Sequence, residues 1–264
     1  MCDLSQQEQQ LLAEKLCPIV YFHPDEKYFP CSVEYYLRNS DLYRGNVFLK
    51  PSPQKMDLTV YNSSDDHLNI KEFTGMKAEI KIPYTVPTYV FIQNDPTSGL
   101  YRVCYSFLYC YNGAYNIYKC PCKCCEAGAH KYDLEHISIY ATAKGEIQIV
   151  YFGAHGTKDG IYRNNFQVET TPQGRLIIYA ARMGHGLYPN PRTYYRIFCA
   201  ANDECSSKGI SWMPRVEMIN DKTDWNAWLG SWESFDAGDS PFHHEYYKEE
   251  SQEETNDCKR ICCP

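Results

Sequence analysis

One alternating stretch, Ala129 to Tyr140, constrains the fold of this chain more than any other. Its alternation places four side chains on one face of a strand: Asp133, Glu135, Ile137 and Ile139. The isoleucines predict a buried face, and the carboxylates precede them on it. Because a buried carboxylate is costly without a cation or hydrogen bonds, we expect the pair at the rim of a pocket. An edge strand with solvated charges is the alternative.

Three histidines near the ends of strand-like runs add to this pair. His130 lies three residues before Asp133, and His155 and His185 follow two later apolar runs, beside glycines that permit tight turns. A mixed set of nitrogen and oxygen donors suits a divalent cation, with Ca²⁺ or Mg²⁺ expected over Zn²⁺ when carboxylates dominate. We therefore predict one metal site from five residues: His130, Asp133, Glu135, His155 and His185.

Several segments resemble a known family. Residues 18–34 resemble the opening signature of the vacuolar protein sorting-associated protein 62 family, which includes a plant group of unknown function. Asp133-Leu134-Glu135-His136 resembles its Asp-Trp-Glu-His motif, with Leu134 in place of Trp. Residues 151–155 and 181–189 resemble two further blocks in the same order. The resemblance covers roughly residues 15–235, and the family's name suggests a role in vacuolar trafficking.

The central motif is also similar to the Gly-His-Arg-His-Asp-Trp-Glu heptapeptide of necrosis-inducing cytolysins. This second resemblance covers the motif alone. It implies a β-sandwich in which His, Asp and Glu hold a divalent cation near a site for a sugar headgroup. It makes Asp133 and Glu135 the first candidate ligands and His130 the next, whereas Tyr132 stands in place of the second histidine.

Short strand-like runs between Pro and Gly turns predict a mainly antiparallel β fold, a two-sheet β-sandwich with a short N-terminal helix and few other helices. Ser5 and Glu8 form a capping-box pattern, and Pro18 ends that helix. We expect the four tryptophans between Trp212 and Trp232 to pack in the core. The chain divides into a helix (1–17), one sandwich domain (18–242) and an acidic, cysteine-rich tail (243–264).

Bulk properties narrow the class of protein. The net charge is −7 and no basic patch occurs, so we expect no nucleic-acid partner. No run approaches the about 18 apolar residues of a spanning helix, so we expect no transmembrane segment. The first residues lack the pattern of a signal peptide. We therefore expect a cytoplasmic protein, free or peripheral to membranes, with its thiols mostly reduced.

Two segments dense in cysteine, 120–125 and 258–263, form a second candidate cluster. The first contains one Cys-x-x-Cys pair, Cys122 and Cys125, whereas zinc sites usually need two. A metal clip, disulfides within or between chains, and unpaired thiols all remain open. The predicted metal or disulfide cluster has seven members: Cys120, Cys122, Cys124, Cys125, Cys258, Cys262 and Cys263.

Three functions fit these features, and we expect a binding protein rather than an enzyme. The first is a non-enzymatic, metal-assisted binding module for a glycan or lipid headgroup. The second is a self-assembling, disulfide-cross-linked structural or occlusion-type protein, in which the 14 Cys and 24 Tyr would join copies. The third is a metal-dependent hydrolase with His155 or His185 as base; it ranks last because no nucleophile motif or phosphate loop is present.

Overall fold

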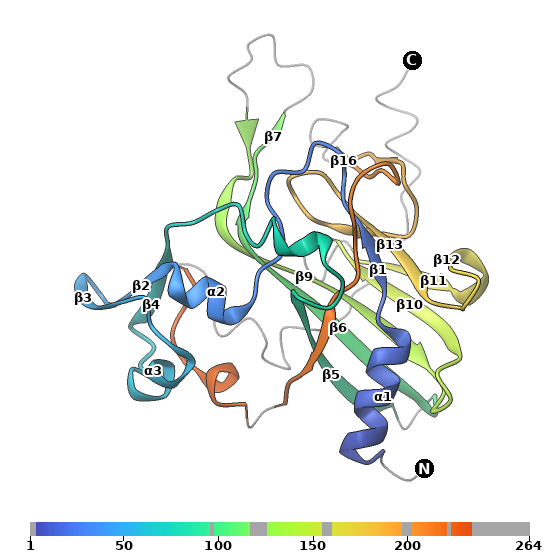
Figure 1. Cartoon of the computed structure of the whole chain (residues 1–264), viewed down its shortest axis with the longest axis horizontal. Coiled ribbons are helices and arrows are strands. Elements are labelled where there is room, and N and C mark those ends of the chain that lie inside the picture. The colour runs from blue at the N-terminus through green and yellow to red at the C-terminus, as the bar shows by residue number, and fades with distance from the viewer. Residues whose placement is uncertain are drawn as a thin grey trace.

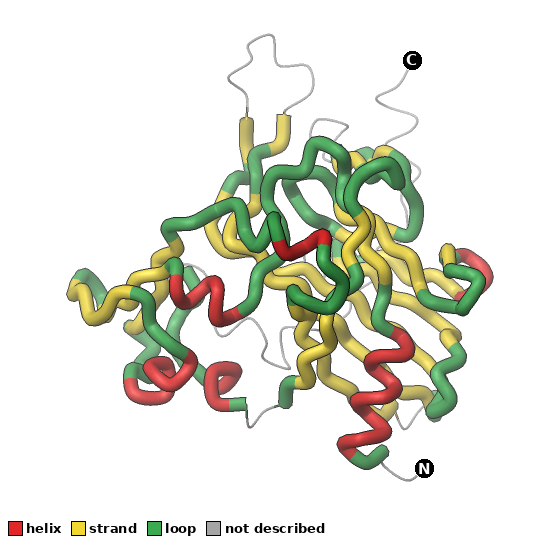
Figure 2. The backbone as a smooth tube through the Cα atoms, in the orientation of Figure 1, coloured by secondary structure: helices red, strands yellow, loops and turns green. Residues whose placement is uncertain are grey.

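The computed structural model describes six stretches of the chain: residues 4–95, 98–116, 126–154, 160–196, 202–220 and 223–233. Within them, strands predominate and helices are short and few, which confirms the predicted mainly β class (Figures 1 and 2). The sequence predicted two sheets, whereas these stretches form five, of which two are large. His155 and all seven cysteines of the predicted cluster lie outside the described residues.

The largest sheet has six strands in the order β11-β10-β9-β6-β5-β18. Its neighbours pair antiparallel, except that β18 runs parallel to β5. The two longest strands, β6 and β9, lie at its centre (Figure 1). The strand bounds are β5 Pro87–Asp95, β6 Leu100–Asn112, β9 His130–Ala141, β10 Ile147–Gly153, β11 Ile161–Asn164 and β18 Arg215–Met218.

The second large sheet has the order β12-β13-β1-β17, with β14 paired to β13. Strand β1 runs parallel to β13 and antiparallel to β17. The strand bounds are β1 Ile19–Tyr21, β12 Glu169–Thr170, β13 Leu176–Ala180, β14 Leu187–Tyr188 and β17 Ser211–Trp212. Helix α1 (Gln6–Leu16) precedes β1 and begins with the predicted capping box of Ser5 and Glu8.

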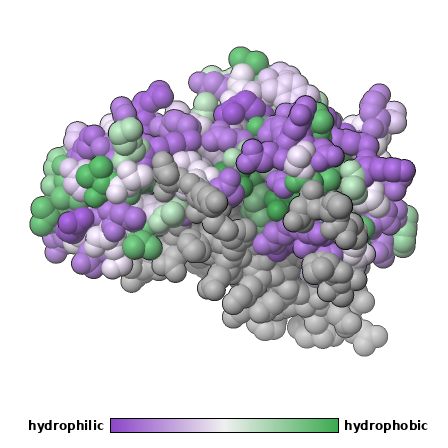
Figure 3. All heavy atoms as spheres, turned by 90° about the horizontal axis from the view of Figure 1, so that it is seen from below, coloured by the Kyte–Doolittle hydropathy of each residue, from purple (hydrophilic) through white to green (hydrophobic). Residues whose placement is uncertain are grey.

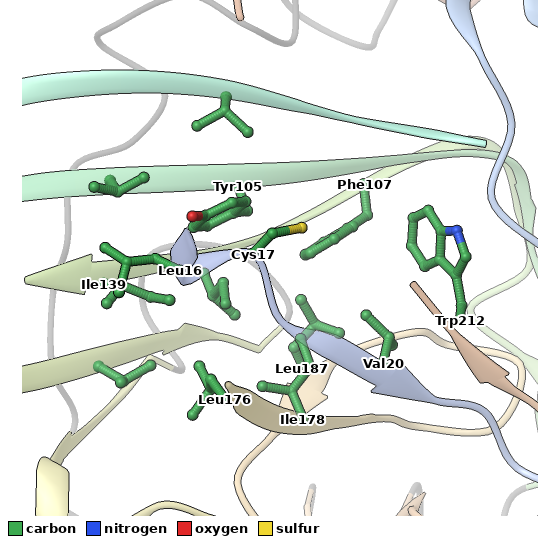
Figure 4. Packing of buried hydrophobic residues seen from close by; sticks show 14 of the residues in the cluster. Leu16, Cys17, Val20, Tyr105, Phe107, Ile139, Leu176, Ile178, Leu187 and Trp212 are labelled. Carbon is green, nitrogen blue, oxygen red and sulfur yellow. The ribbon is translucent and has the colours of Figure 1, made fainter. Parts of the chain in front are cut away.

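One apolar core joins these two sheets and α1. Figure 4 shows its side chains meeting from both sides, with Val20, Ile178 and Trp212 opposite Tyr105 and Phe107. Burial of such side chains stabilises a fold by roughly 25 cal/mol per Å² of apolar surface. Ile137 and Ile139 belong to this core, whereas Tyr132 and Leu134 pack on the opposite face of the sheet. The alternation of this segment therefore predicted its two faces correctly.

A third layer covers that opposite face. It holds a three-stranded sheet in the order β3-β2-β4 and the short helices α2 and α3 (Figure 1). Between this layer and the large sheet lies a second apolar core, in which Trp225, Trp228 and Trp232 are buried. Trp212 is buried in the first core, between the two large sheets. Both observations confirm the predicted packing of the tryptophans. The bounds are α2 Val33–Arg38, β2 Ser40–Arg44, β3 Val47–Pro51, α3 Lys55–Val60, β4 Asp66–Ile70 and the 3-10 turn η4 Asp224–Ala227.

The remaining elements are short. The pairs β7 (Tyr115–Asn116) with β8 (Glu126–Ala127), and β15 (Thr193–Tyr194) with β16 (Asp203–Glu204), form two small sheets. Single 3-10 turns occur at η1 (Glu79–Lys81) and η3 (Asn165–Gln167). In the stretches that the structure describes, every helix is too short or too polar to cross a membrane.

Candidate functional site

The predicted carboxylate pair lies on the core-facing side of β9. Asp133 and Glu135 are buried, and they pair in register with Tyr109 and Phe107 of β6, whose rings belong to the first core. The pair therefore lies on the face shared with Ile137, toward the start of the strand. Here the apolar core gives way to charged groups.

His185 lies against Asp133, although 52 residues separate them in the sequence. Its Nδ1 is 2.8 Å from Oδ2 of Asp133, and its side chain is fully buried. A tight turn between β13 and β14 positions the ring. In this turn the backbone N–H of His185 donates to the carbonyl of Ala181, and His185 has a φ of 55°. This conformation is uncommon for a side chain other than glycine, so the turn holds the imidazole at a strained backbone position.

A second carboxylate, Glu26, faces the other ring nitrogen of His185. Glu26 Oε1 lies 3.6 Å from His185 Nε2, and its side chain is almost fully buried. Oε1 also accepts backbone N–H groups of Lys27 and Tyr28, each at 2.9 Å, and Oε2 accepts that of Met183 at 2.8 Å. Burial opposes the charge of Glu26, but the nearby imidazole of His185 and the hydrogen bonds from the backbone outweigh burial and lower the pKa of Glu26.

These contacts set the charge of His185. Burial alone would lower its pKa, but the hydrogen bond to Asp133 and the negative charges of Asp133 and Glu26 outweigh burial and raise the pKa to about 9. His185 is therefore an imidazolium at neutral pH and donates from Nδ1 to Asp133. We call Glu26, Asp133, Glu135, His185 and Tyr109 the charged cluster.

Tyr109 completes this cluster. Its ring stacks on the imidazole of His185, with centroids 3.9 Å apart and planes 5° apart. Burial, followed by the charges of Asp133, Glu135 and Glu26, raises the pKa of Tyr109 well above its usual value. The phenol therefore stays neutral, close to all three carboxylates. Its buried hydroxyl has no hydrogen-bond partner within the described stretches.

The other predicted ligands lie differently. His130 is exposed, and its Nδ1 lies 2.8 Å from the carbonyl oxygen of Tyr132, a residue with a φ of 57°. His155 falls in residues 155–159, which the structure leaves out. Sequence reasoning did not select Glu26 or Tyr109. The one signal for Glu26 is its place in the opening segment that resembles the family signature.

The charged cluster contains the oxygen donors that a cation site needs, but these donors are not arranged around one point. Two carboxylates, Asp133 and Glu26, flank the imidazolium, and the charge of a third, Glu135, acts on Tyr109. Hard oxygen donors of this kind suit Ca²⁺ or Mg²⁺. Among the described residues, however, no group of three or more His, Cys, Asp or Glu side chains is arranged to hold a metal ion. The predicted divalent cation therefore stays a prediction, with Asp133 and Glu135 as the residues that would hold it.

The fold and the cluster define a mainly β protein with an ion-paired group buried where three distant segments meet. A family model described as vacuolar protein sorting-associated protein 62 matches residues 1–201. The chain belongs to this family, as the resemblance of its motifs implied. A comparison with curated proteins finds no match.

Solved structures of low identity are also similar to the chain. Necrosis and Ethylene inducing Protein 2, from the causal agent of cocoa's Witches Broom disease, is 13% identical over 92% of this chain and 88% of that chain, with a TM-score of 0.44. NLPPya in complex with glucosamine is 12% identical over 98% and 91%, with a TM-score of 0.47.

Proposed function

We propose that the chain is a non-enzymatic binding module for a glycan or a lipid headgroup, with its binding site at the charged cluster. One observation carries the proposal. Glu26, Asp133 and His185 come from three segments that resemble separate blocks of the family, and the fold brings them into contact. Burying such an ion group stabilises a fold less well than apolar packing, whereas perturbed ionisable groups concentrate at functional sites.

Asp133 is the most exposed member of the charged cluster. Its side chain is 11% exposed, against 1% for Glu26 and none for His185. The residues 128–130 that precede it are exposed as well. A carboxylate at this position can accept hydrogen bonds from sugar hydroxyls, and His185 fixes its orientation. Because carboxylates outnumber the imidazolium, a ligand that carries both hydroxyls and a protonated amine complements the charge best.

The proposal also includes a divalent cation that assists binding. Asp133 and Glu135 would hold it, and it would neutralise their charges and bind ligand hydroxyls when present. A placement at the membrane periphery is consistent with a lipid-headgroup ligand. We keep the role in trafficking that the family's name suggests as a prediction about cellular context.

Glycan binding is tested with the full chain and two matched variants. An array of amino sugars, neutral glycans and glycosylated lipids selects a ligand, and calorimetry measures its affinity for the wild type, Asp133→Asn and Glu146→Gln. Glu146 is an exposed carboxylate beside the turn at the far end of β9. We expect Asp133→Asn to weaken binding by about tenfold or more, because hydrogen bonds to a charged acceptor are strong. Equal affinities of Asp133→Asn and wild type, or no bound ligand in any class, would contradict the proposal.

A second candidate function, self-association, rests on an exposed apolar patch. Val47 and Phe48 of β3, with Met56 and Val60 of α3, are between 51% and 76% exposed. Figure 3 shows apolar residues at the surface on the side where β3 and α3 lie in Figure 1. Exposed patches of this kind often mark interaction sites, and a second copy would cover this one.

Sedimentation of the chain at rising concentration tests that candidate. We expect Phe48→Asp to weaken association, while Phe166→Asp, at an exposed phenylalanine of η3, leaves it unchanged. A wild type that stays monomeric at all concentrations would exclude the patch as a self-association site.

The geometry does not favour the hydrolase alternative. A general base must be unprotonated at working pH, whereas His185 is held as an imidazolium between Asp133 and Glu26. A role for His155 as base stays untested because that residue lies outside the described stretches.

A further inference from the structure

We propose that Cys31 and Cys110 form an intramolecular disulfide that ties the loop carrying Glu26 to the central strand β6. Their Sγ atoms are 3.4 Å apart, although 79 residues separate them in the sequence. Both side chains are fully buried in the second core. Neither cysteine belongs to the two cysteine-dense segments that the sequence singled out.

The backbone already holds the two thiols side by side. The N–H of Cys31 donates to the carbonyl of Leu108 at 2.8 Å, and Pro30 forms an antiparallel bridge with Tyr109. A disulfide has an S–S distance of about 2.05 Å, so the sulfurs must approach by only about 1.3 Å. Small side-chain rotations can supply a movement of this size without separating the strands.

Other buried cysteines have different surroundings. The Sγ of Cys17 contacts the carbonyl oxygen of Pro214 at 3.9 Å, and that of Cys205 contacts the carbonyl oxygen of Tyr179 at 3.7 Å. Thiol–thiol contact thus distinguishes the Cys31–Cys110 pair from these two buried cysteines. Cys17 and Cys205 provide matched internal controls for burial.

The bond would form by exchange with a small-molecule disulfide such as oxidised glutathione. The thiolate of one cysteine attacks the reagent and releases one glutathione. The other cysteine then attacks the mixed disulfide and releases a second glutathione, so two thiols are oxidised and one disulfide is reduced to two thiols. Burial and the neighbouring Cys110 raise the pKa of Cys31 well above its usual value, so exchange needs the pair to be exposed, as during folding.

The bond would also fix parts of the charged cluster. Cys31 follows the loop that carries Glu26, and Cys110 directly follows Tyr109, whose ring stacks on His185. Tyr109 faces the first core and Cys110 the second. The disulfide would therefore lock the Glu26 loop against β6 from the side opposite the cluster, and its closed loop would restrict the unfolded chain.

Refolding in redox buffers tests the proposal. The full chain is unfolded in urea, refolded with excess oxidised or reduced glutathione, quenched with acid and alkylated, and its peptides are mapped by mass spectrometry. With oxidised glutathione we expect a Cys31–Cys110 linked peptide as the main product of these two cysteines, while Cys17 and Cys205 remain alkylated thiols. The melting temperature should rise by roughly 5–10 °C relative to the reduced protein.

Variants separate this bond from other effects of oxidation. Cys31→Ala should remove the gain in melting temperature, and Cys17→Ala should keep it. Recovery of Cys31 and Cys110 as thiols, or linked mainly to other cysteines, would overturn the proposal. An equal gain in wild type and Cys31→Ala would overturn it as well.

Discussion

Two buried histidines on neighbouring parts of the fold differ in protonation state. His185 lies between Asp133 and Glu26, and its pKa is raised to about 9. His136 lies on β9, three residues after Asp133, and its ring is 5.8 Å from that of Tyr151. Burial and, to a lesser degree, the charge of Arg102 lower the pKa of His136 to about 3. At neutral pH one imidazole is charged and the other is neutral.

The two histidines show that the charged groups beside each ring, and not its burial, decide whether the imidazole is protonated. Burial opposes the charged form of both histidines, and the two carboxylates overcome it only at His185. The surroundings of His136 are built for close packing: a Cβ on Gly153 would lie 2.6 Å from its Cε1. The carboxylates of the first region therefore keep its imidazole charged, whereas the second region keeps its imidazole neutral.

Replacing the charged histidine should produce the largest effect. His185→Gln removes the cation from between two buried carboxylates, so we expect the free energy of unfolding at pH 7 to fall by about 3–5 kcal/mol. Urea denaturation measures it. His130→Gln, at an exposed position, should change stability by less than about 0.5 kcal/mol. Similar small losses in both variants would show that the ion group contributes little.

The two histidines should change the pH dependence of stability in opposite directions. The folded-state pKa of His185 lies above the unfolded value of about 6.5, so its contribution is complete below pH 6.5 and is lost as pH rises through 9. The size is on the order of 3 kcal/mol. The folded-state pKa of His136 lies below 6.5, so its contribution is present above pH 6.5 and is lost as pH falls toward 3.

Urea unfolding across this pH range distinguishes these contributions. Between pH 6.5 and 9.5 the wild type should lose stability that His185→Gln does not lose. Between pH 6.5 and 4 a His136→Gln variant should show a shallower decline than the wild type. Parallel profiles for all three proteins would mean that neither histidine has the charge state described.

A steric change at the neutral region should have a moderate effect. Gly153→Ala would bring a methyl group against the ring of His136, and overpacking of this kind costs about 1–3 kcal/mol. Thermal melts compare it with the double variant Gly153→Ala/His136→Ala. Because the smaller side chain removes the clash, the two substitutions should be non-additive. Strict additivity would contradict direct contact as the cause.

Metal addition should change stability by no more than the steric change does. If Asp133 and Glu135 hold Ca²⁺ or Mg²⁺, millimolar metal should stabilise the wild type relative to chelator by roughly 1–3 kcal/mol, as expected for ligand at up to about 100 times its dissociation constant. Asp133→Ala/Glu135→Ala should abolish that difference. Identical wild-type melts with chelator and with metal would contradict the predicted metal site. The ion-paired cluster would then stand without a metal.

The alternation of β9 predicted the buried face, and the glycine-rich turn near His185 marked a residue that does meet Asp133. Local pattern could supply this much because strand parity is a property of neighbouring residues. It could not identify Glu26, which accepts a hydrogen bond from the backbone N–H of Met183, 157 residues away. The stacking of Tyr109 on His185 and the contact of Cys31 with Cys110 are equally non-local. Such contacts depend on how the sheets pair.

The histidine nitrogens provide the most direct measurement of the central claim. Nitrogen-detected NMR of protein labelled in its eight histidines, with assignments from His185→Gln and His136→Gln, reports the protonation of each ring. We expect that at pH 7.5 both nitrogens of His185 carry protons, and that His136 stays neutral down to about pH 5. A neutral His185 at pH 7.5, titrating near 6.5, would contradict the charged cluster on which the proposed binding site rests.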